Sequence, residues 1–269
     1  MKGKHILFLA VPALLLASCN SLGSEITDSS AIADKVSAIA EKTKDIKNFK
    51  FVIDMEGSNY DEETKKNVSS KSHIALECNE DGEIHCKSES TQGGEKAGEE
   101  FYIVNNATYQ KVMYLDNLEG GKHDITVYGY EGNATAFAEA QMSILAPAMY
   151  MAMFADPTNI AEASALTGED SDDVVRTFKY YSAGEGDLTI SVKVAPKDVE
   201  SVKKAEQEET ISASVDVHYV NNVLKDAKIE GASNKGNKNT MKMTLEVKNK
   251  FAINLPSGWE TKINQKAAA

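Results

Sequence analysis

The chain is poor in arginine, cysteine and catalytic signatures. Arg176 is the only arginine and there are three cysteines among 269 residues. The formal net charge is −12, and an acidic surface repels phosphate backbones, so we expect no nucleic-acid partner. The length is sufficient for a substantial core without disulfide staples. No fixed-period repeat occurs, and one sheet-and-helix domain is expected.

Motifs that carry catalysis are missing as well. The sequence contains no G-x-S-x-G, H-E-x-x-H or G-x-x-x-x-G-K. Ser201 and Lys204 have the Ser-x-x-Lys spacing of penicillin-recognising enzymes, but the companion motifs Ser-Asp-Asn and Lys-Thr-Gly are missing. We therefore expect a protein that is not an enzyme and needs no cofactor. Ser201→Ala would test the one nucleophile that can be named.

His73, Cys78, His85 and Cys86 are residue types that bind zinc. In alternating strands the odd-numbered histidines point away from the even-numbered cysteines, so no metal site is expected. A turn signal at residues 79–82 lies between the cysteines, which could place them opposite each other on a hairpin. They are either a disulfide or two buried, unpaired thiols.

The N-terminus has the layout of an export signal. Lys2 and Lys4 precede a single apolar stretch at residues 6–16, which is too short to span a bilayer. Leu-Ala-Ser-Cys at residues 16–19 then resembles the bacterial lipobox. By that resemblance Cys19 receives a diacylglyceryl thioether and becomes the mature N-terminus. The mature chain would be two charges more negative, because both lysines leave with the signal.

These features divide the chain into four parts. Residues 1–18 are the expected lipoprotein signal peptide and residues 19–30 a lipidated, flexible tether. Residues 31–262 are the expected domain, and residues 263–269 a disordered tail. The expected location is the extracytoplasmic face of the cell membrane. Asn20 does not resemble the usual inner-membrane retention signal, which leaves an outer membrane open where the organism has one.

Hydrophobic periodicity predicts about ten strands and three helices. An amphipathic helix is expected at residues 31–47, capped by Ser29 or Ser30, and a charged one at 197–209. Residues 134–155 are apolar nearly all round and should be buried, with Pro147 kinking or splitting the helix. The strand-like segments from which a sheet of roughly ten strands would be built lie at residues 48–56, 70–78, 83–90, 101–104, 108–115, 124–130, 173–182, 187–195, 210–220, 224–230, 240–248 and 251–255. The predicted fold class is α+β, a large curved antiparallel sheet with helices on its concave face.

The order of these elements resembles the LolA-like superfamily of bacterial lipoproteins and lipoprotein carriers, including the LppX and LprG type. The likeness lies in the helix that leads into the strand at residue 49, the hairpin at residues 101–109, the late hairpin at 215–230 and the closing Ile-Asn-Leu-Pro at 253–256. The resemblance implies a half-barrel sheet around helices, with an apolar cavity that holds acyl chains.

The leading hypothesis is a membrane-anchored protein that binds or carries a lipid or other apolar ligand, with the membrane reached through Cys19. Flexible methionines suit irregular apolar ligands. The predicted lining residues are Val36, Phe51, Ile144, Leu145, Met149 and Met153. Two alternatives stay open. The methionine-rich helix fills an ordinary core, or the protein is a monomeric surface lipoprotein with a structural, protein-binding or cell-wall-binding role and no cavity.

Overall fold

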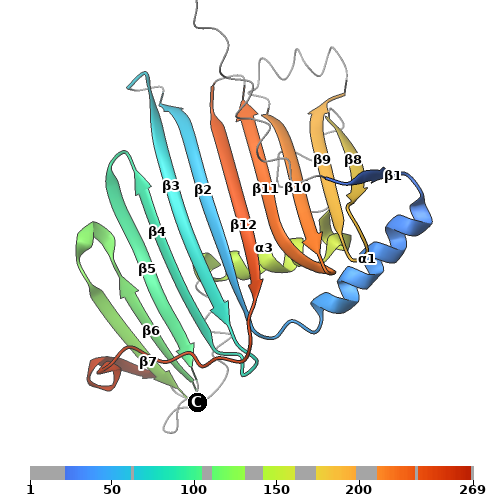
Figure 1. Cartoon of the computed structure of the whole chain (residues 1–269). Coiled ribbons are helices and arrows are strands. Elements are labelled where there is room, and N and C mark those ends of the chain that lie inside the picture. The colour runs from blue at the N-terminus through green and yellow to red at the C-terminus, as the bar shows by residue number, and fades with distance from the viewer. Residues whose placement is uncertain are drawn as a thin grey trace, which may run out of the picture.

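The structure, a computed structural model, describes residues 22–61, 64–104, 111–130, 142–160, 174–197, 211–233 and 236–267. These residues form one sheet and two α-helices (Figure 1). The strands are β1 (Ser24–Ile26), β2 (Phe49–Asp61), β3 (Lys66–Cys78), β4 (Ile84–Gln92), β5 (Glu95–Val104), β6 (Lys111–Asn117), β7 (Asp124–Tyr130), β8 (Val174–Ser182), β9 (Leu188–Pro196), β10 (Ile211–Val220), β11 (Val223–Ser233), β12 (Lys238–Val247) and β13 (Ile263–Ala267). The helices are α1 (Ser29–Thr43) and α3 (Met142–Ala155), with short 3-10 helices η1 (Glu119–Gly121), η2 (Pro157–Asn159) and η3 (Trp259–Lys262).

The sheet consists of two meanders that meet in its middle. The strand order is β1-β8-β9-β10-β11-β12-β2-β3-β4-β5-β6-β7-β13. Neighbours pair antiparallel throughout, except that β13 runs parallel to β7. The pairing of β12 with β2 joins the late meander to the early one. The predicted fold class, an α+β protein built on a large curved antiparallel sheet, is confirmed.

Alternation along the strands makes one face of the sheet apolar, and both helices pack on it. Phe51 and Ile53 of β2, Val217 of β10 and Met243 of β12 are fully buried on this side with Ile39 of α1. We call this side the inner face and the opposite side the outer face. The outer face is polar over the long strands, as expected for an antiparallel sheet with one wet side.

Two hydrogen bonds fix the C-terminal end of α3 inside the molecule. The buried hydroxyl of Tyr219 on β10 donates to the carbonyl oxygen of Phe154 at 2.7 Å. The Thr43 hydroxyl at the end of α1 donates to the carbonyl oxygen of Ala155 at 2.9 Å. These carbonyls have no partner within the helix, because the last turn of a helix leaves its acceptors free. The buried end of α3 is thereby held by both the sheet and α1.

A second, smaller core lies on the outer face of β5 to β7. Val104, Tyr114 and Val127 are buried there under Ile253 and Trp259 of the C-terminal segment. We call residues 251–267 the C-terminal arm. At this end of the sheet the arm covers the outer face, whereas the outer face of β9 to β12 is not covered by the arm (Figure 1).

The two ends of the described chain differ from the sequence-based expectations. The predicted flexible tether reaches residue 30, but β1 pairs with β8 within it and α1 already begins at Ser29. The N-cap is Asp28, whose carboxylate accepts from the Ser30 backbone N–H at 3.0 Å, not Ser29 or Ser30. At the other end β13 occupies most of the predicted disordered tail, because it adds backbone hydrogen bonds to the β7 edge.

Other elements also differ from the sequence-based prediction. Residues 251–255, predicted as a strand, form no strand and lie as an extended cover on the second core. The described α3 is not split at Pro147. Only residue 197 of the predicted helix at 197–209 belongs to the described residues. Ser201 and Lys204 lie outside them. None of the helices described is both long enough and apolar enough to span a membrane.

Candidate functional site

Along the strands, the side chains of the inner face change from large and apolar to small and polar. On β3, the partly buried Ile74 is followed towards the strand start by Ser72 and Ser70 on the same side. On β12, Met241 is followed by the exposed Asn239. The apolar core lies under α1 and α3, and the inner face becomes small and polar beyond it.

The sheet register brings the small and polar positions of six strands into one transverse row. Its members are Ala213, Gly231, Asn239, Gly57, Ser70 and Gln92. A Cβ atom at Gly57 would lie 2.7 Å from Asn239 Oδ1 and 2.8 Å from Ser70 Oγ. Because glycine has no Cβ, the amide and the hydroxyl converge over the β2 backbone. The row therefore presents hydrogen-bonding groups where the alternation would otherwise place apolar side chains.

A groove of about 480 Å³ runs along this row, and we call it the inner groove. Its inner-face lining consists of Met55, Gly57, Ser70, Ser72, Ser90, Gln92, Ala213, Ile229, Gly231, Asn239 and Met241. Met55, Ile229 and Met241 are half-buried and form an apolar floor. None of these inner-face side chains is charged. The groove also touches Glu56, Lys71 and Glu230, which occupy the alternate, outward positions of the same strands. The groove can therefore solvate an apolar chain and hydrogen-bond an uncharged polar group.

The described part of α3 does not fill this groove. The helix crosses behind the strands below their upper ends (Figure 1), and it contacts β2, β3 and β11. Ala148, Tyr150, Met151 and Met153 are partly buried against the main core. No described α3 side chain lines the inner groove.

Three of the predicted lining residues belong to the core instead. Phe51 is fully buried, and Val36 and Met153 are partly buried against the same cluster. None of them lines the inner groove. These three side chains pack within the core, because large apolar residues fill space more readily than they leave it.

The remaining predicted lining residues lie on α3. Met149 is 54% exposed and lines no part of the inner groove. Ile144 and Leu145 lie in the first turns of the helix, and their side chains fall outside the described part of the chain. The signal for the lining of the inner groove was present in the sequence. Gly57, Ser70 and Ser72 are small or polar residues at inward positions of otherwise amphipathic strands.

The two cysteines share the inner face but do not lie opposite each other. Cys78 pairs with Ile84 and Cys86 pairs with Leu76, so the two cysteines are diagonal neighbours on the hairpin. The expected placement directly opposite each other was wrong. Both are free thiols in the structure. Burial raises the pKa of the Cys86 thiol to about 12 and that of Cys78 above its ordinary value. Both therefore stay protonated and unreactive near neutral pH.

The histidines of the same hairpin lie on the outer face, as the alternation predicts. His73 Nδ1 lies 2.7 Å from the Asp54 carboxylate. His85 lies 3.1 Å from Glu77 and 2.9 Å from Glu100, and its ring stacks on Tyr102. Among the described residues, no three histidine, cysteine or acidic side chains come together as a metal site would require.

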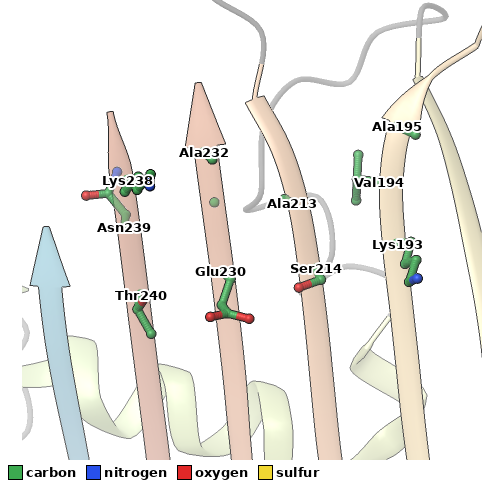
Figure 2. Close-up of a pocket in the computed structure, with 11 residues that line it drawn as sticks. Lys193, Val194, Ala195, Ala213, Ser214, Glu230, Ala232, Lys238, Asn239 and Thr240 are labelled. Atoms are coloured by element: carbon green, nitrogen blue, oxygen red, sulfur yellow. The ribbon is translucent and has the colours of Figure 1, made fainter. Parts of the chain in front are cut away.

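A second pocket, of about 440 Å³, lies near the inner groove but mainly on the outer face. Figure 2 shows Lys193, Ser214, Glu230 and Thr240 in one row across β9 to β12. These four residues alternate with the buried inner-face positions of the same strands. Its lining combines these polar and charged side chains with Val194, Ala195 and Ala232. It shares residues with the inner groove, which are Ala213, Glu230, Gly231, Asn239 and Thr240.

Comparisons with known proteins give only distant structural similarity. No family model and no curated relative matches the sequence. One similar solved structure is a beta-barrel-like protein of domain of unknown function DUF1849 from Brucella abortus, with 8% identity and a TM-score of 0.20 over 76% of this chain and 99% of that one. Another is a DUF1329 family protein from Desulfovibrio piger ATCC 29098, with 10% identity and a TM-score of 0.25 over 86% of this chain and 95% of that one.

Proposed function

We propose that this protein is an extracytoplasmic lipoprotein, anchored through Cys19, that binds an apolar or amphiphilic ligand in the inner groove without catalysing a reaction. The observation that carries the proposal is the groove on the core-facing side of the sheet, whose inner-face side chains are uncharged and whose floor is Met55, Ile229 and Met241. Its volume of about 480 Å³ is within the range of about 300–1,000 Å³ typical of small-ligand pockets.

The methionines of the floor suit a ligand of irregular shape. Met55 and Met241 face each other across the pairing of β2 with β12. Unbranched thioether side chains adapt their rotamers to the ligand, and each methylene buried there contributes roughly 0.8 kcal/mol. Ser72 and Asn239 supply hydrogen bonds for an uncharged polar end. A charged headgroup would find no counter-ion among the inner-face side chains.

We further propose that the domain is a member of the LolA-like superfamily. A curved sheet with α1 and α3 packed on one face agrees with the architecture which that resemblance implies. The ligand would then lie beside the helices on the sheet and not within the helical layer. The anchor supports a carrier or receptor at the membrane, because two acyl chains hold a protein there stably.

The test uses the chain from residue 20 onward, produced without acylation. Native mass spectrometry should detect co-purified lipid, and a fluorescent fatty acid should bind to the delipidated protein. Ser72→Trp fills the groove and should weaken binding by about ten-fold or more, which is about 1.4 kcal/mol. Ser69→Trp is the matched control on the outer face of the same strand and should leave binding unchanged.

An apo mass together with no fatty-acid uptake would reject the proposal. Equal loss of binding in the two tryptophan variants would also reject the groove as the site. The alternative role, binding of a protein or cell-wall polymer, is favoured by the charged outer-face row of Lys193 and Glu230. Under that alternative Lys193→Ala would abolish capture of the partner, and Ser72→Trp would not.

A further inference from the structure

The N-terminal end of the described chain is fastened to the outer face. β1 pairs with β8 through Ser24 opposite Ser182 and Ile26 opposite Tyr180. Gly23 has a φ of +79° and packs against the backbone at Ser182 so closely that any Cβ would clash with it. Leu22, the residue before it, lines a hollow of the outer face together with residues of β9 to β12. The point from which the anchor leaves the fold is therefore defined.

That hollow is large, with a volume of about 860 Å³. We call it the outer hollow. Its lining includes Leu22, Ala183 and Val220, and Leu22 and Val220 are 48% and 42% exposed. Scattered exposed apolar residues are normal on a protein surface. Here, however, Leu22, Ala183 and Val220 line the same hollow, next to the point where the chain continues towards the proposed acyl chains on Cys19.

The charges of the outer hollow are balanced, unlike those of the chain. Its lining includes three aspartates and three lysines, which are Asp187, Asp216, Asp226, Lys225, Lys228 and Lys242. Lys35 also donates to the carbonyls of Gly184 and Asp187 in the adjoining turn, where Glu185 adds one carboxylate. The chain as a whole carries −12. This region can approach anionic headgroups with much less repulsion than the average surface.

We propose that the outer face around the outer hollow is the surface with which the protein lies against the lipid headgroups of its membrane. The inference rests on the proposed acylation of Cys19. Two residues, Asn20 and Ser21, separate Cys19 from Leu22, so the Cα atoms of Cys19 and Leu22 are at most about 11 Å apart. That distance is close to one Debye length at physiological salt, and the charges of this face act directly on the bilayer surface.

This orientation has a consequence for ligand exchange. The inner groove lies on the other side of the sheet from the outer hollow. It therefore opens away from the headgroups beneath the protein. A ligand would enter and leave at the membrane-distal side, where a partner could deliver or accept it.

The test uses the full, acylated chain in vesicles of phosphatidylcholine and phosphatidylglycerol that carry a nitroxide quencher on a choline headgroup. A fluorescent thiol probe is attached at Val220→Cys, and at Met149→Cys on the inner-face side as the matched control. Both positions are exposed. Cys78 and Cys86 react slowly, because burial raises the pKa of each thiol, and labelling of the unaltered chain measures their background.

The headgroup quencher should reduce the fluorescence at position 220 several-fold more than at position 149. Gly23→Val, which detaches β1 from the β8 edge, should abolish that contrast while the protein still floats with the vesicles. Equal quenching at both positions of a floating protein overturns the orientation and leaves the anchor and the ligand groove standing. A chain that fails to float overturns both the anchor and this proposal, whereas loss of fatty-acid binding alone affects only the groove.

Discussion

At the scale of single residues, Tyr219 stabilises the packing of α3 on the sheet. Its side chain is 1% exposed and its hydroxyl is the partner of the Phe154 carbonyl at 2.7 Å. Tyr219→Phe keeps the ring but leaves that carbonyl without its partner, so the free energy of unfolding should fall by about 1–3 kcal/mol. Urea unfolding measures the change. Tyr60→Phe, at an exposed tyrosine, should stay within about 0.5 kcal/mol of the parent protein, and an equal effect of both variants would contradict the argument.

His218 makes the stability of the folded state depend on pH. Its hydrogen bond with the Asp226 carboxylate, at 2.7 Å, raises the pKa of the ring, and burial opposes the shift. A raised pKa in the folded state means that the stabilisation is fully present below the ordinary pKa of about 6.5 and is lost as pH rises through the folded-state value. His218→Gln should therefore cost more stability at about pH 5 than at about pH 9. Thermal unfolding at the two pH values measures this, and Asp226→Asn should remove the same difference.

At the scale of elements, Asn79 connects the β3–β4 turn to the C-terminal arm. It is buried, its Oδ1 accepts from the backbone N–H groups of Asp81 and Glu83, and its Nδ2 donates to the Phe251 carbonyl at 3.1 Å. Asn79→Ala should cost about 2 kcal/mol or more, because several partners lose their hydrogen bonds together. The arm should loosen, and the emission of Trp259 should shift to longer wavelength.

Asn48→Ala provides the control for this change. The Asn48 side chain also stabilises this turn, because its Oδ1 accepts from the Glu80 N–H at 3.0 Å, and both of its side-chain hydrogen bonds are to Glu80 and not to the arm. Its removal should leave the Trp259 emission unchanged. A red shift in both variants would show that the turn, and not the Asn79 bond to the arm, controls the second core.

The same elements show what the sequence could predict. Alternation placed β9 to within one residue at each end, because every second side chain of this strand is buried, and it gave the bounds of β7. It found the start of β2 but ended the strand at residue 56, whereas β2 continues to Asp61. It could not reveal β1 or β13, since three or five residues of edge strand carry no period of their own. Their pairing is supplied by backbone hydrogen bonds, which any sequence can make.

The candidate site was missed for a related reason. A pattern of apolar residues identifies which face is buried but not which strands are neighbours. The inner groove depends on the pairing of β12 with β2, which joins Asn239 to Gly57 across most of the chain length. Large residues such as Phe51 were chosen because they mark the core, whereas a groove is defined by small residues that leave room.

At the scale of the whole molecule, the open sheet has two edges, and a terminal segment covers each. β1 shields β8, and β13 shields β7. An unpaired strand edge is a template for a second chain. Truncation after Lys262 removes β13 and should expose the β7 edge, so the protein should self-associate as its concentration rises. Sedimentation velocity measures this, with truncation after Ala267 as the control that keeps β13 and should behave as the parent. The Trp259 emission must stay unchanged for the result to count as edge pairing and not unfolding. A truncated chain that keeps that emission and remains as monomeric as the control at every concentration would show that β13 does not guard the edge.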